Sequence, residues 1–159
     1  MEKRKLGVGA GATRRLTLLA VSALLLLPSF AAQALAPAKV VGIKLLDSTV
    51  DPAITDMRIV LDRDAVKPGR VTLAVVNESK SLMHEVLIVR DDAGKPLPFD
   101  SKQGRVVEKR IHSLGEISDL GPGKSGKVTL DLKPGTYLLF CNEPGHYQDG
   151  MQATLTVAP

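Results

Sequence analysis

The stretch from Cys141 to Met151 constrains this chain most, because it places a thiol, an imidazole and a thioether at regular intervals in one short loop. Four residues separate Cys141 from His146, and four more separate His146 from Met151. Strand-like runs flank the loop on both sides, at 136–140 and 152–157. We therefore expect two strands of a sheet to hold this loop between them.

The donor atoms of this loop belong to a recognisable class of metal site. A thiolate, two imidazole nitrogens and a long axial thioether are the ligands of a blue-copper centre. The loop supplies one imidazole, so the second must come from elsewhere in a chain that has only three histidines. His84 lies in the strand-like run 83–89, whereas His112 fits no such pattern and is interpreted as a surface or loop histidine. The sequence therefore predicts one copper ion bound by four residues: His84, Cys141, His146 and Met151.

Each of these residues also has an ordinary explanation. A lone cysteine is usually a small buried apolar residue, a lone histidine is often structural, and Met151 begins an alternating strand that could place it in the core. The conjunction of the three in one loop, shaped by Pro144-Gly145 and Gly150, favours metal binding. Zinc is the alternative ion, but structural zinc usually takes four cysteine or histidine ligands. A thioether favours copper.

At these residues the sequence resembles the cupredoxins, and the resemblance covers nearly all of the chain after residue 34. The Cys-x4-His-x4-Met spacing is similar to the ligand loops of the rusticyanin and auracyanin type. The asparagine-containing turn 77–80 before His84 also fits. Many cupredoxins have asparagine directly after the first histidine ligand, and this chain has Glu85 there. The resemblance implies an all-β fold, a Greek-key β-sandwich of the cupredoxin type.

The resemblance also implies roles for residues around the ligands. The loop histidine of the family lies near the surface in an apolar patch and passes the electron, which would be His146 here, with Pro144 and Tyr147 in the patch. Backbone N–H groups near the sulfur, such as that of Glu85, would tune the reduction potential.

Period-two alternation of apolar residues supports the all-β expectation independently. It predicts strands with one buried face around Val41–Leu45, 57–61, 70–76 and 128–132, in addition to the two that flank the loop. Many short strands bounded by Pro and Gly indicate a sandwich or barrel. The segment 91–126 is less regular: 91–95 is typical of a turn, and 105–111 could be a strand or a short helix.

Residues 1–34 have the features of a cleaved signal peptide. An apolar run at 16–27 follows a basic start and ends before Pro28, and Ala32-Gln33-Ala34 offers a cleavage site after Ala34. The run is too short for a membrane span, which needs ~20 residues, although an uncleaved anchor is the alternative. A twin-arginine signal is matched only in part, because Thr17 is polar. We expect a periplasmic or otherwise exported protein with no stable membrane span, and a single domain at 35–159.

Removal of the leader changes the charge balance and with it the expected partners. The leader holds five of the 21 basic residues and one of the 17 acidic ones, so 16 of each remain and the net charge becomes zero. No basic surface for nucleic acid is then expected. Cys141 is the only cysteine, so no internal disulfide is possible, and metal binding would protect its thiol in an oxidising compartment.

Three classes of function are compatible with such a domain. The favoured one is a small monomeric electron carrier with redox protein partners. The second is a copper-binding protein for tolerance or delivery. Neither a Met-rich nor a His-rich tail in the sequence supports this class. The third is an enzyme, but copper enzymes of this kind use a second, histidine-rich copper site, and three histidines cannot build one. We therefore predict a non-enzymatic protein.

Overall fold

The computed structural model describes residues 37–51, 54–91 and 94–159, and confirms the all-β Greek-key sandwich. The predicted leader and its cleavage site lie outside the described residues. The strands are β1 (Lys39–Asp51), β2 (Ile54–Leu61), β3 (Ala65–Val66), β4 (Gly69–Asn77), β5 (His84–Arg90), β6 (Phe99–Asp100), β7 (Arg105–Val106), β8 (Ser113–Leu120), β9 (Ser125–Leu132), β10 (Gly135–Phe140) and β11 (Gln152–Val157), with one 3-10 turn, η1 (Glu108–Arg110). In the described part, no helix is long and apolar enough to cross a membrane.

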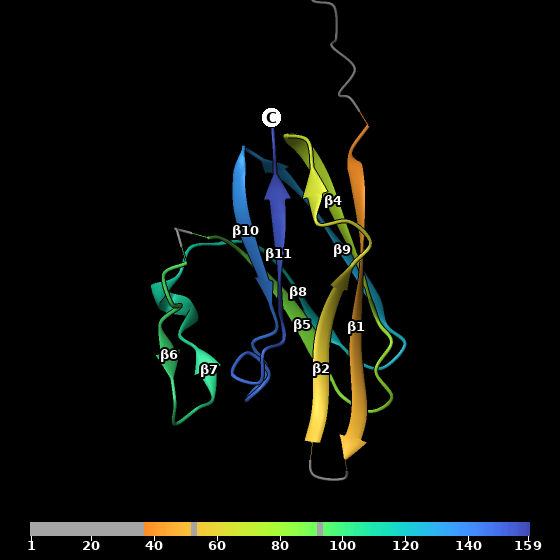
Figure 1. The fold of residues 1–159 in the computed structure, drawn as a ribbon, viewed down its shortest axis with the longest axis vertical. Coiled ribbons are helices and arrows are strands. Elements are labelled where there is room, and N and C mark those ends of the chain that lie inside the picture. Colours follow the sequence, from red (N-terminus) through yellow and green to blue (C-terminus); the bar gives the residue numbers. More distant parts are fainter. Residues whose placement is uncertain (1–36, 52–53, 92–93) are drawn as a thin grey trace, which may run out of the picture. The chain divides into compact units, whose positions relative to one another are not determined.

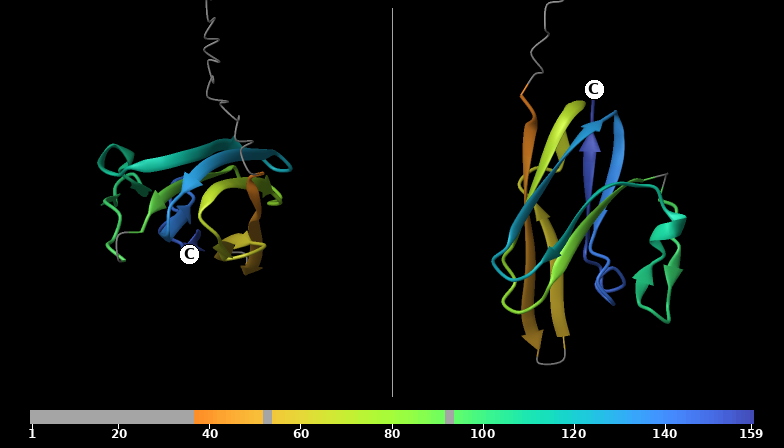
Figure 2. Two further views of the ribbon diagram at one scale, coloured as in Figure 1. Left: turned by 90° about the horizontal axis from the view of Figure 1, so that it is seen from above. Right: turned by 180° about the vertical axis from the view of Figure 1, so that it is seen from behind.

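The strands form two facing sheets and a small separate one (Figures 1 and 2). The first sheet has the order β2-β1-β4-β9, and the second has the order β3-β11-β10-β5-β8. The pairs β1–β4 and β11–β3 are parallel, and the other pairs within the two sheets are antiparallel. β5 and β10 are neighbours in the second sheet, so the start of β5 lies beside the end of β10. This pairing brings His84 close to Cys141.

The predicted alternation gives the main core between the two sheets. Val41, Ile43 and Leu45 of β1 are almost fully buried, and every second residue of β4 from Val71 onward is buried as well. β5 departs from this pattern because its residues from His84 to Val89 are all buried. One face of β5 contributes Val86 and Ile88 to the main core. The other face must therefore be covered by something outside the sandwich.

That cover is the irregular segment between β5 and β8. β6 and β7 pair with each other and lie to one side of the sandwich, next to the loop that follows β10 (Figure 1). Together with their neighbours they cover a second apolar cluster, made of Leu87, Val89, Val106 and Phe140, with Leu97, Phe99, Ile111, Leu138 and Tyr147 packed against it. The sequence left open whether 105–111 forms a strand or a short helix. The structure shows that this stretch contains both a short strand and a 3-10 turn.

β8 is the longest of the strands that the sequence did not predict. It lies at the edge of the second sheet, and only Ile117 and Leu120 among its residues are buried. Its backbone is also irregular at Asp119, which has φ 55°, in the left-handed region that non-glycine residues seldom adopt. An exposed, irregular edge strand carries little period-two signal.

Candidate metal centre

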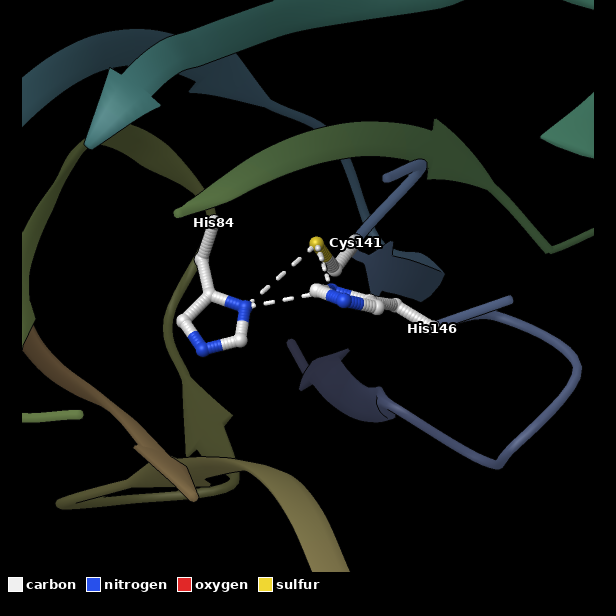
Figure 3. A group of neighbouring side chains, drawn as sticks. All are labelled: His84, Cys141 and His146. Carbon is white, nitrogen blue, oxygen red and sulfur yellow. Dashed lines mark hydrogen bonds between the residues drawn. The ribbon is translucent and has the colours of Figure 1, made fainter. Parts of the chain in front are cut away.

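Three of the four predicted ligands converge at one end of the sandwich (Figure 3). The ligand atoms offered by His84, Cys141 and His146 all lie within 4.8 Å of one another. Cys141 Sγ is 3.3 Å from His146 Nδ1 and 3.8 Å from His84 Nδ1, and the two Nδ1 atoms are 3.2 Å apart. Two imidazole nitrogens and a thiol sulfur therefore face a common point, as a His₂Cys copper site requires.

An irregularity at the start of β5 fixes the position of the first histidine. The register between β5 and β8 shifts between His84 and Val86, and such bulges re-aim side chains and backbone groups. His84 and Glu85 are both buried. The Glu85 N–H donates to Cys141 Sγ over 3.5 Å. This contact confirms the expectation that a backbone N–H at Glu85 lies near the sulfur.

The loop from Cys141 to Met151 is closed by backbone hydrogen bonds. The Cys141 N–H donates to the Met151 carbonyl over 3.1 Å, and the Met151 N–H donates to the His146 carbonyl over 2.9 Å. Gly145 and Gly150 both have φ 88°, which favours glycine and lets the loop turn tightly. The three ligand-type residues of the loop are thus held by one another's backbone.

Met151 is fully buried and belongs to the main core. Its burial is compatible both with packing and with the axial ligand role that the sequence predicts. Its backbone bonds to Cys141 and His146 keep it beside the other ligands. The thioether ligand therefore stays a prediction, which the Met151→Leu experiment below tests.

Burial controls the protonation of the cluster. It raises the pKa of the Cys141 thiol to about 11, against the opposing effect of the Glu85 and Glu143 backbone N–H groups. It lowers the pKa of His84 to about 4, helped by the neighbouring His146. Burial also lowers the pKa of His146, although the Glu143 and Asp149 carboxylates oppose this. At pH 7 the metal-free cluster therefore holds a protonated thiol and two neutral imidazoles.

The donor atoms of the cluster form few hydrogen bonds with residues outside it. His84 Nε2 is buried and has no hydrogen-bond partner among the described residues. A cation bound by the inward-facing Nδ1 and Sγ atoms would not pair with Nε2, but it would compensate for the burial of those three donor atoms. The donor set and its burial therefore fit a copper ion.

Copper binding should release about one proton per ion at pH 7. The thiol must lose its proton to become a ligand, whereas both imidazoles are already neutral. Copper(I) affinity should consequently rise about tenfold per pH unit between pH 7 and pH 9, and more steeply below the His84 pKa of about 4. Anaerobic calorimetry in two buffers of different ionisation enthalpy measures the proton count. A count of zero would mean that the thiolate already exists in the metal-free protein.

Two other sequence interpretations can be checked against the structure. His112 is exposed in a loop, as predicted. Tyr147 was expected in an apolar patch around His146, which stays a prediction. Tyr147 is half-buried and packs on the rings of Phe99 and Phe140, with centroid distances of 6.1 and 5.3 Å. The reason is the cover formed by β6 and β7, which the sequence analysis did not place beside the loop.

The sequence analysis also overlooked Asn142. This residue is 1% exposed, and its side chain bonds to Val106 and Glu108, far away in the sequence. The only signal for a structural role of Asn142 in the sequence is its position, because it is a polar residue that directly follows an apolar strand and the candidate thiolate.

Comparison with known proteins agrees with this geometry. Residues 49–158 match the family described as copper binding proteins, plastocyanin/azurin family. Auracyanin-B of Chloroflexus aurantiacus is 56% identical over 49 residues, which are 30% of this chain and 21% of that protein. The copper-resistant cuproprotein CopI of Pseudomonas aeruginosa is 54% identical over 39 residues, 24% of this chain and 22% of that protein. These matches thus span only about a fifth of each curated relative.

A solved structure shows the same fold. The structure of rusticyanin from Thiobacillus ferrooxidans aligns with 77% of this chain and 79% of its own, with a TM-score of 0.53 and 20% sequence identity. At this identity the likeness concerns the fold alone.

Proposed function

Because the chain belongs to the plastocyanin/azurin family of copper-binding proteins, we propose that it is an exported type 1 (blue) copper protein that acts as a small electron carrier. The proposed ligands are His84, Cys141 and His146, with the thioether of Met151 as a weak axial ligand. The observation that carries the proposal is the convergence of two Nδ1 atoms and one Sγ within 4.8 Å. When bound, copper would supply a one-electron couple between its two oxidation states.

The protein's own part is to keep these ligands in place. His84 begins β5, Cys141 directly follows β10, and these strands are paired. No single flexible segment carries the whole ligand set, which favours retention of the metal. His146 is the one proposed ligand that is not fully buried. Its ring edge therefore offers the shortest route for an electron to a redox protein partner.

The further features of the proposal follow from the sequence. The leader at 1–34 would be cleaved, and the domain at 35–159 would be a periplasmic or otherwise exported monomer without a membrane span. Its near-zero charge gives no reason to expect nucleic acid. It would not be an enzyme, because three histidines cannot build a second, histidine-rich copper site. In the described part of the chain, the only grouping of metal-binding side chains is the one at His84.

The printed name of one relative favours a second candidate function. CopI is named a copper-resistant cuproprotein, so a role in copper tolerance or delivery competes with electron transfer. The two roles place opposite demands on the site, because a carrier keeps its metal and a delivery protein releases it.

The experiment that separates them pairs two measurements on one preparation of copper-loaded protein. Stopped-flow mixing with a small redox reagent gives the rate of electron exchange, and titration with a copper(I) chelator gives the rate of metal loss. We expect fast exchange and slow loss. His112→Ala, which changes an exposed histidine in a loop, serves as the control and should alter neither rate. Slow exchange together with rapid metal loss would favour the delivery function.

Met151→Leu should keep copper bound and raise the reduction potential. Leucine donates less to copper(II) than a thioether does, so the reduced form is relatively favoured. Because Met151 is fully buried and leucine has a similar volume, the change should cost less than about 1.5 kcal/mol of stability. Protein-film voltammetry measures the potential. An unchanged potential would show that Met151 only packs the core.

A further inference from the structure

The segment 99–110, which contains β6, β7 and η1 and is called the strap below, contacts the ligand loop at several points. The loop residues 142–150 lie outside the paired strands of both sheets. We propose that the strap holds this loop in its metal-binding conformation before any metal arrives, and that Asn142 is the positioning residue that links the two. The bracing concerns the metal-free protein, whereas its effect on copper rests on the function proposed above.

The first link is the buried side chain of Asn142. Its Oδ1 accepts a hydrogen bond from the Val106 N–H over 2.7 Å, and its Nδ2 donates to the Val106 carbonyl over 3.1 Å. Nδ2 also donates to Glu108 Oε1 over 2.8 Å. The amide thus pairs with both backbone groups of Val106, as a neighbouring strand would. Because Asn142 directly follows Cys141, any movement at this link acts on the residue next to the sulfur.

The second link joins two backbones. The Gly145 N–H donates to the Gly104 carbonyl over 2.9 Å. Gly104 has φ 65°, and a Cβ atom added there would lie 3.1 Å from Gly145 N. The strap and the loop are therefore in contact immediately before His146, and a side chain at Gly104 would push them apart.

Two side-chain contacts complete the brace. Arg105 forms a 2.9 Å ion pair with Glu143, and Tyr147 packs between Phe99 and Phe140. The ion pair is partly exposed and contributes little. The buried amide is the link whose loss matters most, because it would leave both polar groups of Val106 without partners. These contacts lie on both sides of His146 in the sequence, so loosening the strap should free the loop histidine as well as the region beside Cys141.

The test is hydrogen exchange on the metal-free protein, with three variants. Asn142→Ala removes the amide link, and Gly104→Ala strains the strap without changing the loop sequence. Val71→Ala is the control, because it truncates a fully buried residue of β4 outside the loop and the strap. In the first two variants, protection of the Gly145, His146 and Asp149 amides should fall about tenfold or more, with β1 and β4 unchanged. The control should lower protection without this selectivity. Uniform or absent changes in the first two variants would overturn the proposal.

Copper-loaded samples test the positioning role itself. Copper(I) affinity of Asn142→Ala should fall about 10- to 100-fold, and the thiolate charge-transfer band should shift in position, whereas Val71→Ala should leave the band in place. Loss of loop protection with unchanged affinity and spectrum would overturn the positioning role. If the unaltered protein showed no such band, the proposed copper function would fail, but hydrogen exchange would still decide whether the strap braces the loop.

Discussion

Replacing Cys141 by serine should abolish the intense charge-transfer colour of the copper(II) protein. The colour requires a thiolate, and a serine hydroxyl neither ionises near pH 7 nor offers a soft donor atom. The variant should still fold, because the change is nearly isosteric and the serine oxygen can accept the hydrogen bond that the Glu85 N–H donates to the sulfur. Visible absorption and far-ultraviolet circular dichroism measure the two outcomes.

A matched control for this experiment is His112→Ala. His112 lies in an exposed loop, so its removal should leave the band intact. If the serine variant kept the band, Cys141 would not be the source of the colour, and the assignment of the ligand set would be wrong.

Replacing Glu85 by glutamine should stabilise the metal-free protein at alkaline pH. Burial raises the pKa of Glu85 to about 7, and the Glu143, Glu116 and Glu108 carboxylates add to this. The folded protein therefore binds this proton more tightly than the unfolded chain does. Its stability is greatest below the ordinary pKa of 4.5 and falls as pH rises through about 7. Glutamine stays neutral, so the variant should be more stable by about 2 to 3 kcal/mol at pH 8 and nearly equal at pH 4.

Urea unfolding at a series of pH values measures this difference. Asp131→Asn is the matched control, because Asp131 is exposed on β9 and is not one of the carboxylates that raise the pKa of Glu85. Parallel stability profiles for the Glu85 variant and the unaltered protein would show that Glu85 ionises without penalty in the fold.

The candidate ligands of the loop could be picked out from the sequence because they are local. Cys141, His146 and Met151 are set by spacing within one loop, and that spacing already restricts the kind of metal. His84 is distant in the sequence, and it was found by elimination among three histidines. The pairing of β5 with β10 places His84 beside Cys141, as a shared site requires.

The strap could not be predicted because its contacts leave almost no periodic signal. β6 and β7 have two residues each, and their position depends on a side-chain amide that bridges Asn142 and Val106. The same omission explains why the packing of Tyr147 against Phe99 was not predicted. The buried outer face of β5 was a hint, because a continuous apolar run indicates a strand that is covered on both sides.

Glu85 shows how a departure from the family pattern can leave a backbone hydrogen bond in place. Many cupredoxins have asparagine at this place, and the resemblance therefore left the hydrogen bonding to the sulfur open. The contact to Cys141 Sγ comes from the backbone N–H, which any residue other than proline supplies. The side chain then affects the electrostatics of the site rather than the presence of this hydrogen bond.

The visible spectrum during a copper(II) titration tests the central claim most directly. If His84, Cys141, His146 and Met151 form a type 1 site, an intense thiolate charge-transfer band should grow linearly and stop at one equivalent of copper. A weak spectrum of tetragonal copper(II), or a band that does not saturate at one equivalent, would contradict the account.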